Sequence, residues 1–197
     1  MGTLDNIAET LGKIIPGMQD TDILNYKGRV KIEHHKNGSL LIYPGDKVKS
    51  LYFIKKGVVR AYYFSDEKNM EKTVYIRMEN YFFGDYCSLI LNSSARLYYG
   101  CEEDCILYKF NFDDVKEYLR QNSGLMKFSL HYTLFLLGEH LSRNEDFIFL
   151  NPEERYLKYA KENPEIMKRI PEKHIASLLG VAPASLSRIK RRLYPKN

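Results

Sequence analysis

The sequence predicts an α+β protein made of an antiparallel β-roll (a double-stranded β-helix, or jelly-roll), a long helix and a C-terminal helix-turn-helix. Three observations lead to this fold class. Short apolar runs alternate with turn-forming clusters at intervals of roughly 8 to 12 residues, which is typical of a compact antiparallel roll. Leucines in the next segment follow a heptad spacing. Residues 170–193 have the apolar spacing of two short helices around Leu179-Gly180-Val181.

The composition limits the classes of protein that fit. A chain of 197 residues with 44% hydrophobic residues can form one or two packed domains. We expect no membrane span, because no apolar run approaches the roughly 20 residues that one needs, and no secretory leader. An odd number of cysteines does not support a disulfide framework and favours a cytoplasmic location. The cysteines are Cys87, Cys101 and Cys105.

The first predicted domain, residues 1–111, contains the roll. A weak helical pattern covers residues 4–24, and strands follow from about Gly28 to Phe110. Residues 50–64 predict two strands joined at Gly57, since apolar and aromatic residues flank a glycine turn on both sides.

Residues 112–150 predict a long helix that breaks near Asn122-Ser123-Gly124. Residues spaced by three and four form a heptad seam, and further apolar side chains lie off it, so the helix has two apolar faces. One interpretation is a helix that packs on its own domain, and the other is a dimer interface. The seam residues are Leu130, Leu134, Leu137, Leu141 and Ile148. The apolar residues off the seam are Leu125, Met126, Phe128, Phe135 and Leu136.

The third predicted domain, residues 151–197, is basic. It opens with Asn151 as the N-cap of a helix that starts at Pro152, and it carries a net charge of +6 against −1 for residues 1–150. Such a run alone favours a solvated cationic helix. Its coincidence with a helix-turn-helix pattern favours contact with DNA phosphates instead.

Three roll segments, Tyr43–Asp46, Ser50–Gly57 and Phe83–Asp85, precede the motif Ile175–Ile189. With these in order, nearly the whole chain resembles the Crp/Fnr family of bacterial transcription regulators. The resemblance implies a homodimer that joins through the long helix and binds double-stranded DNA at inverted repeats. An activator of this type would also contact RNA polymerase. Many relatives carry a charged pair where this chain has Pro183-Ala184, so a different operator is expected.

The second motif helix is the expected recognition helix, and Arg188 is the expected base reader because its planar fork can bond guanine O6 and N7 together. A surface ion pair is the alternative role of Arg188. Ala182 stands at the N-cap without the usual hydroxyl side chain. The predicted DNA-contacting residues are Ala184, Ser185, Ser187 and Arg188, with Lys173, Lys190, Arg191 and Arg192 on phosphates. A full β-wing after this helix is not expected before Asn197.

The resemblance also places an effector pocket in the roll. Cyclic-nucleotide-binding relatives hold the phosphate with an Arg followed by Ser or Thr, and here Ala95 stands where that Arg belongs. A shift of one residue would return Arg96 to the position. Because a buried phosphate without a guanidinium is costly, we expect a ligand other than cyclic AMP, or none. The candidate pocket residues are Gly84, Asp85, Tyr86, Ser94 and Arg96.

Rival classes fit less well. A metal-dependent cupin-type enzyme needs converging histidines, and the roll holds only the adjacent His34 and His35 without a His-x-His pattern. We therefore predict no enzyme activity, no metal and no resident cofactor. A ligand-controlled interaction domain that never touches DNA remains the other alternative, and binding to random duplexes would separate the two.

Overall fold

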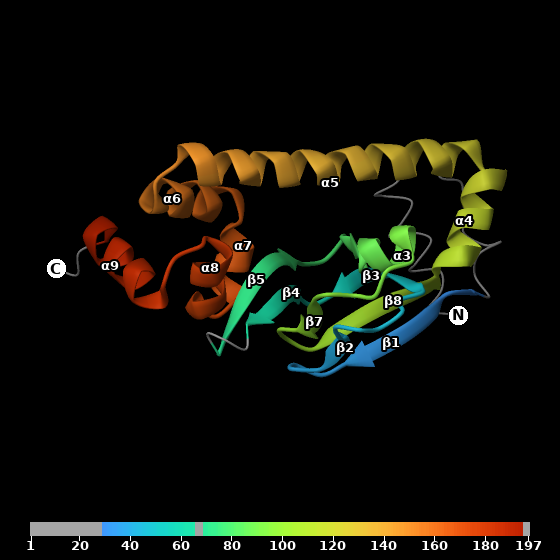
Figure 1. The fold of residues 1–197 in the computed structure, drawn as a ribbon, viewed down its shortest axis with the longest axis horizontal. Coiled ribbons are helices and arrows are strands. Elements are labelled where there is room, and N and C mark those ends of the chain that lie inside the picture. Colours follow the sequence, from blue (N-terminus) through green and yellow to red (C-terminus); the bar gives the residue numbers. More distant parts are fainter. Residues whose placement is uncertain (1–28, 66–68, 195–197) are drawn as a thin grey trace.

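The computed structural model describes residues 29–65 and 69–194. Figure 1 shows a β-roll, a long helix that runs above it and a cluster of short helices at the far end of that helix. This is the predicted order of parts, and the α+β fold class is confirmed. The helix expected over residues 4–24 lies outside the described residues.

Two four-stranded sheets make the roll. The first contains, in spatial order, β1 (Lys31–His35), β8 (Cys105–Asn111), β3 (Ser50–Lys56) and β6 (Phe82–Phe83). The second contains β2 (Leu40–Ile42), β7 (Tyr98–Cys101), β4 (Val59–Ser65) and β5 (Met70–Arg77). All pairings are antiparallel. The predicted turn at Gly57 joins β3 to β4 with φ +106°, and a Cβ there would lie 2.5 Å from Cys105 Sγ, so only glycine fits.

Apolar and aromatic side chains fill the roll interior. Tyr52 stacks on Phe83 with ring centroids 5.1 Å apart, and Phe83 stacks on Tyr99 at 6.2 Å. Ile54 and Leu107 are fully buried beside them. The rings therefore occupy the interior as packed core, as inward-facing strand positions predict.

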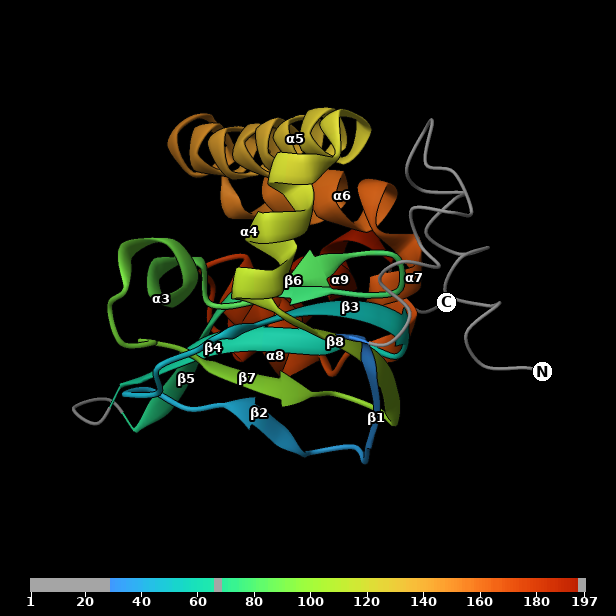
Figure 2. The same cartoon turned by 90° about the vertical axis from the view of Figure 1, so that its right-hand side faces the viewer.

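Two helices follow the roll, α4 (Phe112–Gln121) and α5 (Ser123–Phe149). The predicted break falls at Asn122, whose side chain accepts a hydrogen bond from Leu125 N–H and so caps α5. Figure 2 shows α5 above both sheets. Leu125 is buried against the roll, and the Phe82 N–H donates to Tyr132 Oη at 2.8 Å.

The opposite face of α5 is exposed. The five seam residues, four leucines and one isoleucine, are between 51% and 74% exposed. Met126 and Phe135, which lie off the seam, are also largely exposed, whereas Phe128 packs on the roll. One face of α5 therefore packs on the roll, as the first interpretation expects. The other face is apolar and is not covered by any part of the described residues, which leaves it free for the dimer contact of the second interpretation.

The C-terminal part consists of α6 (Pro152–Glu162), α7 (Pro164–Arg169), α8 (Glu172–Leu178) and α9 (Pro183–Leu193). Asn151 and Glu154 form a reciprocal capping box at the start of α6. Sequence reasoning missed α7, and also α3 (Tyr86–Leu91), because each is only six residues long. Within the described residues, no helix combines the length and the apolar character needed to cross a membrane.

Candidate DNA interface and effector site

The helix-turn-helix motif forms as the glycine spacing predicts. Gly180 adopts φ +72°, and the Val181 N–H donates to Ala176 O at 3.0 Å, which reverses the chain after α8. The N-cap of α9 is Ala182, whose side chain makes no capping hydrogen bond. The first N–H groups of α9 therefore keep no side-chain acceptor.

The first motif helix, α8, packs against the edge of the second sheet. Ile175 and Leu178 are buried in one apolar cluster with Val58 and Ile76 of the roll. The Thr73 N–H of β5 donates to Ser177 Oγ at 2.8 Å, and that hydroxyl donates to Glu71 O at 3.1 Å. The edge strand β5 is thus covered by a helix that satisfies its backbone groups.

Charged side chains surround this contact. His174 is 6% exposed, with Nδ1 3.8 Å from Glu71 and Nε2 3.6 Å from Glu102. Arg60 pairs with both carboxylates, at 2.7 Å from Glu71. Burial and the neighbouring Arg60 lower the pKa of His174 despite the two acids, so the imidazole is neutral near pH 7.

A second ionic contact holds α7 to the roll. Both terminal nitrogens of Arg169 lie 2.8 Å from the Glu79 carboxylate, and Arg169 also pairs with Glu103. Burial opposes ionisation of Glu79, but hydrogen bonds from Arg169 and from the Gly57 N–H outweigh it and lower its pKa to about 2. The planar fork of Arg169 suits this bidentate geometry.

The second helix of the motif, α9, presents two different faces. Leu186 and Ile189 are buried in the cluster that α8 shares. Ala184, Ser187, Arg188 and the predicted phosphate contacts Arg191 and Lys173 are exposed, and Ser185 is half-buried. The predicted DNA-contacting residues of α9 therefore lie off its buried face.

Two of the predicted phosphate contacts are engaged within the module. Lys190 pairs with Glu172 and Arg192 pairs with Glu153, both acids in the first turns of helices. Such exposed pairs are weak, so DNA phosphates can compete for these cations. Within the described residues, Arg188 forms no ion pair, which argues against its alternative role.

The predicted effector residues of the roll differ in burial, from the buried Gly84 and Asp85 to the exposed Arg96. Asp85 is buried, and its carboxylate accepts hydrogen bonds from the Ser88 N–H at 2.8 Å and from the Tyr99 hydroxyl at 3.3 Å. It thus caps α3. Gly84 is buried next to it, and burial raises the pKa of Tyr86 to about 12. The Asp85 carboxylate already has two donors of its own.

The loop before β7 decides the position of the guanidinium. Ala95 is 3% exposed and belongs to the roll core, whereas Arg96 is exposed and Ser94 half-buried. Position 95 therefore faces the interior, and position 96 faces solvent. The inward position is taken by the alanine, and no shift returns Arg96 to the interior.

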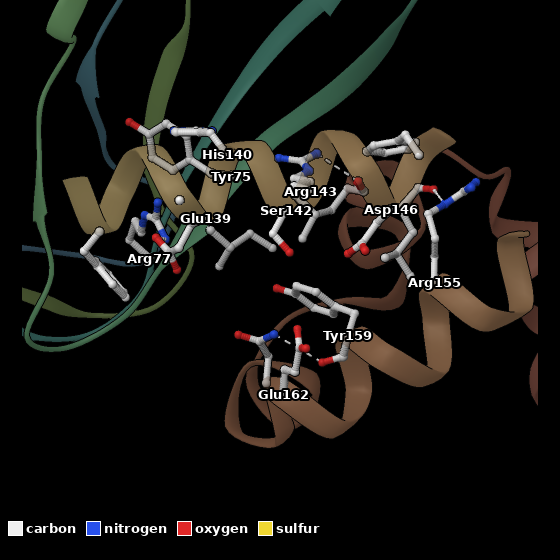
Figure 3. Close-up of a pocket in the computed structure, with 17 residues that line it drawn as sticks. Tyr75, Arg77, Glu139, His140, Ser142, Arg143, Asp146, Arg155, Tyr159 and Glu162 are labelled. Atoms are coloured by element: carbon white, nitrogen blue, oxygen red, sulfur yellow. Dashed lines mark hydrogen bonds and ion pairs between the residues drawn. The ribbon is translucent and has the colours of Figure 1, made fainter. Parts of the chain in front are cut away.

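A cavity that sequence reasoning missed lies beneath α5. Its volume is about 500 Å³, and it is lined by β5, α5, α6 and the end of α8 (Figure 3). We call it the hinge pocket. Because its walls come from four elements spread over residues 75–179, no local pattern could have found it. In the described part of the chain, no cluster of His, Cys, Asp or Glu could hold a metal ion.

Comparisons with known proteins agree with the fold. Residues 32–122 match the family model of the cyclic nucleotide-binding domain. No curated protein matches the sequence significantly.

Solved structures resemble the chain over most of its length. A c-di-GMP-responsive global regulator, CLP of Xanthomonas campestris, is 15% identical over 89% of this chain and 91% of its own, with a TM-score of 0.69. The Thermus thermophilus catabolite activator protein is 19% identical, with 91% and 85% coverage and a TM-score of 0.55. FixK2 of Bradyrhizobium japonicum is 13% identical, with 83% and 84% coverage and a TM-score of 0.64. At these identities the likeness shows a shared fold.

Proposed function

We propose that the chain is a sequence-specific, DNA-binding transcription regulator, because residues 32–122 match the cyclic nucleotide-binding domain model and the chain has the fold of the solved regulators. It would act as a homodimer on an inverted repeat. The observation that carries the proposal is α9, a cationic helix with one face buried in its own module and Arg188 exposed on the other.

The chemistry of α9 suits a major groove. Arg188 can bond guanine O6 and N7 as a fork, which discriminates by about 1–3 kcal/mol against other bases. Arg191, Lys173 and the paired cations Lys190 and Arg192 would neutralise phosphates without regard to sequence. Two such helices in a dimer would enter grooves about 34 Å apart.

Selection of bound sequences from a random duplex library, followed by gel shifts, tests this proposal. We expect an inverted repeat and binding that weakens steeply with salt. Arg188→Ala should cost about 1–3 kcal/mol of discrimination at one base pair of each half-site. The matched control, Arg191→Ala, should weaken all duplexes alike. An unchanged base preference in Arg188→Ala would contradict the assignment, and no binding to any duplex would favour the interaction-domain alternative.

The exposed seam of α5 supports the dimer. Leu130, Leu134, Leu137 and Leu141 follow the spacing at which two helices pack side by side. We expect Leu137→Glu to dissociate the dimer, as measured by analytical ultracentrifugation, and to weaken binding to the inverted repeat by about tenfold or more. Ile90→Glu, an exposed apolar position on α3, is the control and should leave the dimer intact. A dimer that survives Leu137→Glu would rule out this interface.

Control by cyclic AMP is the second candidate, favoured by the family match of residues 32–122. The buried Ala95 argues against it, because a cyclic phosphate in the roll would meet a methyl group where cyclic-nucleotide-binding relatives place a guanidinium. We expect calorimetric titration with cyclic AMP to show no micromolar binding. If the protein activates transcription, RNA polymerase is the expected further partner.

A further inference from the structure

The hinge pocket lies where the roll, α5 and the helix-turn-helix module meet. At about 500 Å³ its size is typical of sites for small molecules. We propose that it binds a nucleotide, whose phosphate engages Arg143 and Arg155, and that this binding changes the DNA affinity of the module. The second part of the inference rests on the proposed function, and the first part does not.

Two guanidiniums in the pocket lack an acidic partner. Arg143 of α5 and Arg155 of α6 pair with no carboxylate within the described residues and donate only to backbone carbonyls. Of the three acids that line the pocket, Glu139 lies 2.9 Å from Arg77 and Asp146 lies 2.7 Å from Lys158. The third, Glu162, is exposed near the end of α6.

Burial makes an anion favourable at Arg143. Its side chain is largely shielded from solvent, and this burial lowers its pKa, the sign of a cation that has lost water without gaining a counter-charge. A phosphate would supply that charge and accept from the remaining donors of both forks.

The rest of the pocket suits a planar ring. Phe135, Phe147 and Tyr159 contribute aromatic walls, and Ser142 and Asn163 add hydroxyl and amide groups. Aromatic side chains stack on any nucleobase, while the polar groups can form hydrogen bonds with the edge of the base or with the ribose. A neutral sugar or an apolar ligand would leave the guanidiniums unpaired.

The same residues touch the turn of the DNA-binding motif. Arg143 donates to Val74 O of β5 and, at 2.9 Å, to Leu178 O at the end of α8. Arg155 donates to Leu179 O at 3.3 Å.

One aromatic ring joins the two arginines to the turn glycine. The guanidiniums of Arg143 and Arg155 lie 5.6 Å and 4.8 Å from the centroid of the Phe147 ring. A Cβ on Gly180 would lie 2.7 Å from that ring, so Phe147 packs directly on the turn. A phosphate bound to the remaining donors would shift both guanidiniums and their hydrogen bonds to the carbonyls, and would therefore alter the position of α8 and of α9.

Calorimetry on the full chain without DNA tests the site. The probes are 5′-AMP and 5′-GMP, with adenosine and guanosine as ring-only controls and inorganic phosphate as the anion-only control. We expect at least one nucleotide to bind with a Kd of about 1 mM or tighter, and its nucleoside and phosphate to bind about tenfold more weakly.

Matched variants locate the site. Arg143→Gln and Arg155→Gln should each weaken nucleotide binding by about tenfold. If Arg143→Gln fails to fold, Arg155→Gln still tests the site, because it keeps the buried contacts of Arg143. Arg120→Gln, which removes an exposed guanidinium of α4, should bind like the parent.

Three outcomes would overturn the inference. The first two are that neither nucleotide binds, or that the nucleosides bind as tightly as the nucleotides. The third is that binding survives the pocket variants and is lost in Arg96→Ala, which would place the ligand in the roll. If the unmodified protein does not bind DNA, the proposed function is contradicted, but the calorimetric result on nucleotide binding still stands. A nucleotide that binds at Arg143 yet leaves gel-shift affinity unchanged would overturn the coupling alone.

Discussion

The two helices of the helix-turn-helix motif lie in opposite environments. In α8, His174, Ile175, Ala176 and Leu178 are buried, and two hydrogen bonds of Ser177 tie the helix to β5. In α9, the buried residues are Leu186 and Ile189. Its other face is cationic and exposed. One helix is fixed to the roll while the next is presented to solvent, although only four residues separate them.

Because of this difference, we expect substitutions in the two helices to affect different properties of the protein. Substitutions in α8 should change stability and the seating of the module, because they remove buried contacts. Substitutions on the exposed face of α9 should change DNA binding and leave stability nearly unaltered. The turn at Gly180 connects the two helices, and a substitution there should reduce stability the most.

Gly180→Ala is expected to have the largest effect. The left-handed φ of +72° costs an alanine about 1–2 kcal/mol, and the contact with Phe147 adds about 1–3 kcal/mol of overpacking. Urea unfolding measures the loss. Gly38→Ala is the matched control, since Gly38 has φ +81° and nothing within 4 Å of a Cβ. Equal losses in both variants would show that the Phe147 contact carries no cost.

A pair of serine substitutions compares the helices directly. Ser177→Ala leaves the Thr73 N–H without its acceptor and should destabilise the protein by about 1–3 kcal/mol. Ser187→Ala removes a hydroxyl that donates to Pro183 O within α9, and it should change stability by less than about 0.5 kcal/mol. Similar unfolding midpoints for the two variants would contradict the anchored role of α8.

The smallest effect concerns pH. The native state lowers the pKa of His174 below the ordinary 6.5, so the unfolded chain binds this proton first as pH falls. The stability that the neutral imidazole contributes is therefore present above about pH 6.5 and is lost below it. The groups around it are Glu71, Glu102, Arg60 and Lys173.

His174→Gln should flatten the pH dependence of unfolding between pH 6.5 and 5 by at most about 1.4 kcal/mol per pH unit, the value for one proton. Unfolding free energies at several pH values measure it. An identical slope in His174→Gln would place the titration at other groups.

Local patterns predicted most of the fold. The glycine turn between β3 and β4, the break at Asn122 and the helix pair around Gly180 each depend on residues within a few positions of one another. The short helices α3 and α7 were missed because six residues give too little periodicity. The pairing of Lys190 and Arg192 with acids of other helices could not be predicted, since spacing does not show which elements meet.

The sequence by itself determined the kinds of element, their order and the cationic character of the last helix, because periodicity and charge are properties of neighbouring residues. Tertiary structure alone decided that Ala95 faces the roll interior while Arg96 faces solvent, that α8 covers β5, and that Arg143, Arg155 and Phe147 converge beneath the turn. These outcomes depend on which distant segments pack together, and that is decided only when the whole chain folds and buries its apolar side chains.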